Sequence, residues 1–256
     1  MSPRSANGQT GSGSERPRPN ARGRSSGRLT LQERQKQDSR EKVIAAAREV
    51  LEERPYALVA VEDILARGGI SRATFYRHFA SKFAVGKALH DEFWPRLFAL
   101  YQGLSEMRDP TEQSFGQWIR KVLDFYRSER TLVIAFQQMM VIEPEFEPTV
   151  NQVSLEVMKA LAASSPSLAY LLEESKRGRR ARMDARLLLE QLDDFFYAAV
   201  AHDWIEDVDD GVVIMARNLQ RLVEDLGRAS AAGRAVSRKS GAKKKSTTSQ
   251  QARRVL

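Results

Sequence analysis

The segment that decides the fold is GGISRATFYRHFASK, which runs from Gly68 to Lys82. Its two consecutive glycines allow a left-handed residue and therefore a tight reversal of the chain between two short helices. Ser71 follows as a helix N-cap, with Ile70 directly before it and Phe75 four residues after it. These two apolar residues have the spacing of a hydrophobic staple, which fixes the angle at which a helix starts. The segment therefore predicts a helix-turn-helix whose second helix begins after Ser71.

The second helix of this motif has an apolar face and a polar face. Phe75 and Phe79 are four residues apart, so both side chains are expected to turn inward against the preceding helices. The candidate DNA-binding residues are Arg72, Ala73, Thr74, Tyr76, Arg77 and His78 on the outer side, with Lys82 in the first turn of the next helix. An arginine can pair with guanine O6 and N7, and a threonine methyl can meet a thymine methyl. A phosphate at the helix start would offset the unfavourable position of the Lys82 charge.

The apolar periodicity around this motif is helical. One stripe of a first helix is formed by Val43, Ile44, Ala47, Val50 and Leu51. Asp38, with Glu41 as its N3 partner, predicts the start of this helix, and Asp109 before Pro110 predicts the start of a later one. Further helices are expected over about 81–104, 110–127, 131–142, 148–163, 180–204 and 209–227. Pro95 predicts a kink or break in the first of these. Because no window alternates as a strand would, the predicted fold is all-α.

The charge of the chain is concentrated at its ends. Residues 1–37 carry eight Lys or Arg and two acidic residues, and residues 229–256 carry eight Lys or Arg and no acidic residue. Both segments are too poor in apolar side chains to form a core and are predicted to be disordered. The chain then divides into a basic arm (1–37), a helix-turn-helix domain (38–90), a second helical domain (91–228) and a basic tail (229–256). The basic ends either contact DNA or only keep the chain in solution.

Several function classes are excluded by residues that the sequence lacks. There is no cysteine and there are only three scattered histidines, so no cofactor and no metal site is expected. No catalytic motif is present, which argues against an enzyme. Asp193-Asp194 is interpreted as a pair of helix-surface carboxylates, and no charged residue is singled out as a ligand anchor. No apolar run approaches the roughly 20 residues of a membrane helix, and no secretory signal is recognised, so a cytoplasmic protein without a membrane partner is expected.

The stretch from Arg40 to about Leu89 resembles the DNA-binding domain of TetR-family transcriptional regulators. The resemblance is carried by Ile44-Ala45-Ala46-Ala47, Glu62-Asp63-Ile64, Gly69-Ile70-Ser71, Thr74-Phe75-Tyr76-Arg77-His78-Phe79 and Ser81-Lys82. It implies a homodimeric, ligand-responsive repressor that binds a near-palindromic operator. It also implies that Thr74, Tyr76, His78 and Lys82 face DNA, the last three mostly at phosphates. Ala60 departs from the family pattern, in which a capping threonine that also reaches a phosphate usually stands there.

The same resemblance implies a C-terminal helical domain for ligand binding and dimerisation. The expected lining for a small apolar or amphipathic effector is Phe98, Tyr101, Trp118, Phe136 and Met139, and the alternative is that these residues form an ordinary core. Wide apolar stripes on the last two helices suggest that one side of each helix packs on its own chain and the other on a second copy, and the alternative is an interior helix of a monomer. The expected dimer interface consists of Leu188, Leu192, Phe195, Phe196, Ala216, Leu219 and Val223. The alternative function is an architectural DNA-binding protein that has little sequence preference and no effector.

Overall fold

The computed structural model is helical throughout the part of the chain that it describes, with no β-strand there, which confirms the all-α prediction. The described residues are 30–107, 111–146, 155–159, 162, 168–202 and 207–229. The elements are α1 (Leu31–Glu53), η1 (Tyr56–Leu58), α2 (Val61–Gly68), α3 (Arg72–His78), α4 (Lys82–Glu106), α5 (Glu112–Ser128), α6 (Arg130–Ile142), η2 (Pro144–Phe146), η3 (Ala169–Leu172) and α8 (Lys176–Ala201). Residues 155–159 and 208–229 are also helical. Within these ranges, no helix combines the length and the apolar character needed to cross a membrane.

The first helix begins earlier than its sequence suggests. The Thr30 backbone N–H donates to Glu33 Oε2 at 2.7 Å, and the Glu33 N–H donates back to Thr30 Oγ1 at 3.2 Å. This reciprocal cap starts α1 at Leu31, so the predicted start at Asp38 is wrong, as is the prediction of disorder for residues 31–37. The helix spans the boundary between two units of the chain, residues 1–37 and 38–256. The remaining residues of the predicted basic ends, 1–29 and 230–256, lie outside the described ranges.

The helix-turn-helix forms as its sequence predicts. Gly69 ends α2 with a φ of 57°, in the left-handed region that favours glycine, and the Ile70 N–H donates to the Leu65 carbonyl at 3.0 Å. Ser71 is the N-cap of α3, and its Oγ accepts the Thr74 N–H at 3.1 Å. Phe75 is fully buried against the helical stripe that was predicted for α1. The small core of the motif therefore fixes the position of α3.

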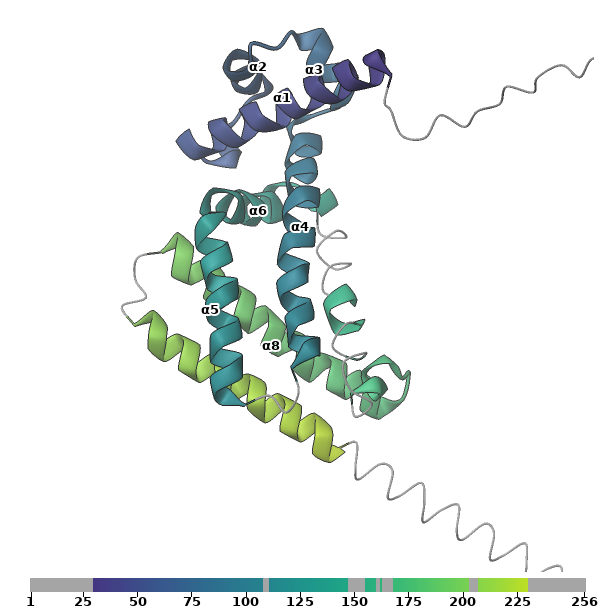
Figure 1. Ribbon diagram of the computed structural model, residues 1–256, viewed down its shortest axis with the longest axis vertical. Coiled ribbons are helices and arrows are strands. Elements are labelled where there is room, and N and C mark those ends of the chain that lie inside the picture. The colour runs from purple at the N-terminus through teal and green to yellow at the C-terminus, as the bar shows by residue number, and fades with distance from the viewer. Residues whose placement is uncertain are drawn as a thin grey trace, which may run out of the picture. The chain divides into compact units, whose positions relative to one another are not determined.

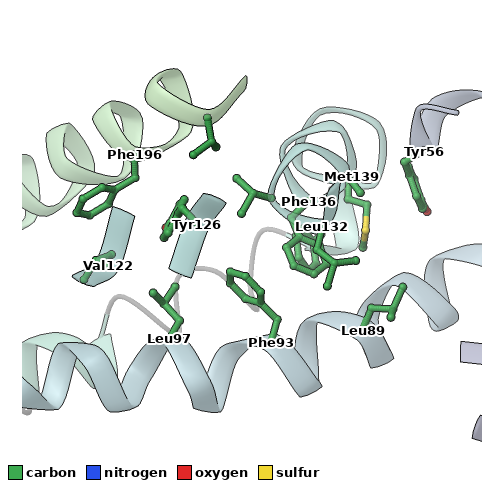
Figure 2. Close-up of a cluster of buried hydrophobic side chains, with 14 of the residues drawn as sticks. Tyr56, Leu89, Phe93, Leu97, Val122, Tyr126, Leu132, Phe136, Met139 and Phe196 are labelled. Atoms are coloured by element: carbon green, nitrogen blue, oxygen red, sulfur yellow. The ribbon is translucent and has the colours of Figure 1, made fainter. Parts of the chain in front are cut away.

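The long helix α4 runs from the helix-turn-helix to the second group of helices (Figure 1). It continues through Pro95, which is exposed on its outer side, so the predicted break does not occur. Gly86 allows α6 to approach α4 closely, since a Cβ at this position would lie 2.7 Å from Met139 Sδ. Further along, Phe93 and Phe136 face each other across the two helices with ring centroids 5.2 Å apart (Figure 2).

The start of α5 also differs from its prediction. Thr111 is the N-cap: its Oγ1 accepts the Ser114 N–H at 3.2 Å, and its own N–H donates to Ser114 Oγ at 2.8 Å. The helix therefore begins at Glu112, and the predicted cap at Asp109 lies outside the described residues.

The residues that were predicted to bind a second copy of the chain belong instead to its own core. Those buried within the single chain are Leu188, Leu192, Phe195, Phe196, Ala216 and Leu219, while Val223 is partly buried against the same cluster. The apolar faces of these helices are buried within the chain itself. Residues 208–229 pack on α8, where Phe195 lies against Gly211, and on α5 near Gly116. These residues thus leave little surface for a second copy of the chain, and their part in a dimer interface stays a prediction. Exposed apolar side chains of the two helices are Met183, Leu187, Val213 and Ile214.

Candidate nucleic-acid interface and ligand pocket

The outer side of α3 presents the predicted DNA-binding residues together. Arg72, Ala73, Tyr76 and Arg77 are exposed, and Thr74 and His78 are partly buried. Tyr76 is a large aromatic residue with half of its surface in solvent, although its ring also packs edge-on against Phe75 at 5.2 Å. The recognition helix of a helix-turn-helix contacts base edges through its N-terminal residues. An exposed, capped helix with these side chains has the arrangement that such contacts require.

The first residue of α3 is paired within the protein. Arg72 Nη2 lies 2.6 Å from Glu62 Oε1 on α2, and both side chains are more than half exposed. Ion pairs of this kind contribute little to stability because water screens them. The guanidinium is thus held at the leading end of α3 by an exposed carboxylate.

His78 at the other end of α3 is positioned by α1. Its Nε2 lies 2.7 Å from Ser39 Oγ, which ties the last turn of α3 to the first helix. At the leading end, Thr74 Oγ1 accepts the hydroxyl hydrogen of Ser71 at 2.9 Å. The two partly buried polar residues of α3 are therefore oriented by local hydrogen bonds.

Lys82 has a structural role in addition to the predicted one. Its Nζ donates to the carbonyl oxygens of Tyr56 at 3.1 Å and Val59 at 2.9 Å, and it lies 4.6 Å from the centre of the Tyr56 ring. These contacts offset the unfavourable position of a cation at a helix N-terminus without a phosphate. Lys82 thus fastens η1 to the start of α4, and its contact with a DNA phosphate stays a prediction.

The α2 helix is capped without the threonine that the family pattern would place at position 60. The Ala60 N–H donates to Asp63 Oδ2 at 2.8 Å, and Asp63 also accepts from Arg54 at 3.0 Å. Because alanine has no side-chain acceptor, only one half of a capping box is formed here. Position 60 therefore supplies no side-chain group for a phosphate contact.

A pocket of about 470 Å³ lies among α4, α5, α6 and α8. It is lined by His90, Phe93, Trp94, Leu97, Tyr101, Tyr126, Val133, Phe136, Gln137, Met140, Phe146, Val157, Met158, Arg186, Leu189, Glu190, Asp193 and Asp194. Its size is in the range of small-molecule sites, roughly 300 to 1,000 Å³.

Of the five residues expected to line an effector site, two line this pocket and three do not, and their contact with an effector stays a prediction. Tyr101 and Phe136 line the pocket, whereas Phe98, Trp118 and Met139 do not. The Trp118 indole N–H donates to the Leu100 carbonyl at 2.7 Å within the core, and the fully buried Met139 packs near Gly86. Phe98 is partly buried and packs on Trp94 at 5.5 Å.

Two titratable groups of the pocket were missed by the sequence analysis. Asp193 accepts a hydrogen bond from the buried Tyr126 hydroxyl, and burial raises the pKa of the carboxyl above its usual value. Burial also lowers the pKa of His90, because removal from water disfavours the charged imidazolium. The interpretation of Asp193 as a surface carboxylate is therefore wrong, because the side chain faces a pocket rather than open solvent. A lone histidine within an apolar helix pattern was the signal that could have found His90.

Helix α6 connects this pocket to the helix-turn-helix. It contributes Phe136 and Gln137 to the pocket lining, and its neighbouring Gln138 side chain accepts the Ala57 N–H at 3.2 Å. At the end of α6, Glu143 Oε1 accepts the Tyr56 hydroxyl hydrogen at 2.7 Å. Both Tyr56 and Ala57 belong to η1, which Lys82 fastens to α4. Helix α6 is therefore hydrogen-bonded to η1, which in turn is hydrogen-bonded to the start of α4.

Comparisons with known proteins agree with this geometry. The family model for bacterial regulatory proteins of the tetR family matches residues 43–89. The HTH-type transcriptional regulator EthR of Mycobacterium tuberculosis is 34% identical over 86 residues, which cover 34% of this chain and 39% of that protein. The EthR protein of Mycobacterium bovis matches equally well. The matched part of the chain thus spans well under half the length of these curated relatives.

One solved structure extends the likeness beyond the matched domain. The crystal structure of a tetR-family transcriptional regulator from Streptomyces coelicolor aligns with a TM-score of 0.55 and 16% sequence identity, covering 78% of this chain and 89% of that one. At this identity the likeness concerns the fold, with its N-terminal helix-turn-helix and its helical C-terminal domain. Residues 43–89 are therefore similar to the DNA-binding domain of TetR-family transcriptional regulators, and beyond this domain the likeness is one of fold.

Proposed function

We propose that this chain is a dimeric transcriptional regulator that binds a two-fold symmetric DNA operator through α3 and acts without enzymatic turnover. The observation that carries this proposal is the exposed outer side of α3, where Arg72, Tyr76 and Arg77 stand on a helix fixed by its buried phenylalanines. Arg72 and Thr74 would contact base edges near the helix start, and Tyr76, His78 and Lys82 would contact phosphates. TetR-family regulators generally act as dimers, which fits an operator with two half-sites.

We also propose that the pocket binds a small amphipathic effector and that this binding lowers the affinity for the operator, as in a ligand-responsive repressor. Its volume and its mixture of aromatic walls and few polar groups support such a ligand. The path from the pocket to DNA would be α6, then the hydrogen bonds to Tyr56 and Ala57 of η1, then α4. Operator and effector would then weaken each other's binding reciprocally, typically by about 1–3 kcal/mol.

The exposed apolar side chains of α8 and of residues 208–229 support a revised dimer interface. Met183 and Leu187 are one helical turn apart on α8, and Val213 and Ile214 are exposed on the later helix. A two-fold dimer uses the same patch of each copy, so these side chains would be buried in pairs. The basic arm and tail would add non-specific DNA affinity, and residues 1–29 and 230–256 of these segments lie outside the described ranges.

The proposal is tested by selecting DNA duplexes from a random pool with the purified full-length chain. We expect an enriched motif with two inverted half-sites whose centres are about one helical turn, roughly 34 Å, apart. A footprint of the enriched duplex should be symmetric. Recovery of no motif after repeated selection would contradict a sequence-specific regulator.

The alternative function, an architectural DNA-binding protein without an effector, is distinguished by the same experiment. Such a protein would bind all duplexes of the pool with similar affinity, and its affinity would fall steeply with salt because phosphate contacts dominate. The pocket, which an architectural protein does not need, favours the regulator.

A further inference from the structure

The pocket contains a carboxylate that no cation of the described residues neutralises. Asp193 on α8 lines the pocket, and its one hydrogen-bond donor within the described ranges is the hydroxyl of Tyr126. The basic residue of the lining, Arg186, lies 2.8 Å from Glu190 and so compensates a different acid. Asp194, the neighbouring residue, is a third acid of the lining and is exposed. The pocket is therefore acidic on its α8 side.

A carboxylate in this position is unfavourable in the absence of an opposite charge from the protein. Burial raises the pKa of Asp193, the Tyr126 hydrogen bond opposes that rise, and the negative charge of Asp194 adds to it. A carboxylate removed from water costs free energy unless an opposite charge or sufficient hydrogen bonds accompany it. Burial also raises the pKa of Tyr126, so its hydroxyl stays protonated and acts as a neutral donor. A positively charged ligand would supply the opposite charge that the described residues do not place beside Asp193.

The remaining walls of the pocket are rich in aromatic rings. Phe93 and Phe136 are 5.2 Å apart between ring centres, and Phe136 and Phe146 are 6.2 Å apart (Figure 2 shows the first pair). Trp94 and Tyr101 also contribute to the lining. Aromatic faces attract cations electrostatically and bury apolar surface at the same time. Such walls suit the hydrocarbon body of an organic cation.

His90 provides an independent sign that the pocket receives a ligand with a polar group. This residue of α4 is only 7% exposed, and its Nδ1 is buried without a hydrogen-bond partner among the described residues. Its ring packs edge-on against Phe136 at 5.3 Å and Phe146 at 5.1 Å, within the aromatic wall. Buried polar atoms are nearly always paired, so an unpaired one beside a pocket indicates a missing partner.

We propose that the pocket binds an organic cation, a protonated amine on an aromatic or aliphatic body, with its ammonium group at Asp193 and its body between the aromatic rings. A polar group of the same ligand pairs with His90. The inference deepens the proposed function, on which it rests, by giving the effector a chemical class. A neutral apolar effector would leave Asp193 without an opposite charge and His90 Nδ1 without a hydrogen-bond partner.

The test compares two compounds of equal size that differ in charge. Binding of 4-phenylbutylamine and of 4-phenyl-1-butanol to the full-length protein, without DNA, is measured by calorimetry at neutral pH. We expect the amine to bind at least about tenfold more tightly than the alcohol. Equal affinities, tighter binding of the alcohol, or no binding of the amine at millimolar concentration would each overturn the proposal. This comparison uses the unaltered chain and does not depend on the folding of a variant.

Two variants assign the selectivity to a residue. Asp193→Asn should weaken binding of the amine by about tenfold and leave binding of the alcohol unchanged. The matched control is Asp124→Asn, which removes a carboxylate from the outer surface of α5 and should change neither affinity. An equal loss for both compounds in Asp193→Asn would indicate a collapsed pocket rather than a lost charge and would overturn the assignment.

Failure of this proposal and failure of the proposed function give different results. Duplex selection with the same protein preparation reports on DNA binding alone. An enriched operator motif without amine selectivity refutes the cationic ligand and leaves the regulator in place. Amine selectivity without any DNA sequence preference supports the pocket assignment and refutes the regulator.

Discussion

Arg72 Nη2 lies 2.6 Å from Glu62 Oε1, so the first residue of α3 is held by a carboxylate of the preceding helix. Binding to a base edge requires Arg72 to leave this partner. We therefore expect Glu62→Gln to raise operator affinity by up to about fivefold, because an exposed ion pair is worth no more than about 1 kcal/mol. Fluorescence anisotropy with a labelled operator measures the change.

Glu145→Gln is the matched control for this prediction, since it removes an exposed carboxylate outside the helix-turn-helix. It should leave operator affinity unchanged. A decrease in affinity for Glu62→Gln would mean that Glu62 orients Arg72 toward DNA instead of competing for it.

Lys82 should matter for stability as well as for DNA. Lys82→Met keeps most of the stem but leaves the Tyr56 and Val59 carbonyls without their donor, at a cost of about 1–3 kcal/mol. We expect the thermal midpoint of unfolding to fall by several degrees. Lys87→Met, which removes an exposed ammonium group paired with Asp91 on the same helix, should change it little. Equal thermal midpoints of unfolding for the two variants would show that Lys82 does not stabilise the fold, which would leave phosphate contact as its only role.

The hydrogen bond from Tyr56 to Glu143 should carry part of the coupling between pocket and DNA. Tyr56→Phe removes the 2.7 Å bond between η1 and the end of α6 and leaves the pocket lining intact. We expect an unchanged affinity for an amine effector in the absence of DNA, together with a reduced effect of that amine on operator affinity. Titrations of each ligand with and without the other measure the coupling. A coupling equal to that of the unaltered chain would exclude this path.

Asp193 should make the stability of the ligand-free protein depend on pH. Its pKa is raised by burial, so between its ordinary value and its value in the folded state the folded protein binds more protons than the unfolded one. The contribution of Asp193 to stability therefore falls as pH rises through this window. Asp193→Asn should be more stable than the unaltered protein at pH 7, and the difference should shrink as pH is lowered toward the ordinary pKa of an aspartate. Urea denaturation at several pH values tests this, and a difference that is constant with pH would contradict it.

The helix-turn-helix could be predicted because its signals are local. Gly69, Ser71 and Phe75 specify a reversal, a cap and a buried ring within seven residues, and each behaves in the structure as its residue type predicts. The start of α1 was missed because Asp38 and Thr30 both offer caps with an acidic N3 partner, and the sequence alone does not rank them.

The pocket could be predicted only in part because it depends on which faces of separate helices meet. Trp118 and Tyr101 have similar sequence contexts, yet only Tyr101 lines the pocket, while Trp118 is fixed in the core by the Leu100 carbonyl. Asp193 looks like a surface carboxylate until α5 brings Tyr126 against it. The apolar stripes of α8 and residues 208–229 likewise indicate burial on two sides, but they do not say which of their residues the chain itself buries.

The most direct test of the central claim, that α3 reads DNA, compares operator binding by two arginine variants. Arg72→Ala removes the leading arginine of α3, and Arg120→Ala removes an exposed arginine of α5 that pairs with Asp209. On the selected operator, Arg72→Ala should lose about 1–3 kcal/mol of binding free energy and relax the preference at one base position, while Arg120→Ala binds like the unaltered chain. An Arg72→Ala variant with unaltered affinity and unaltered base preference would contradict the account.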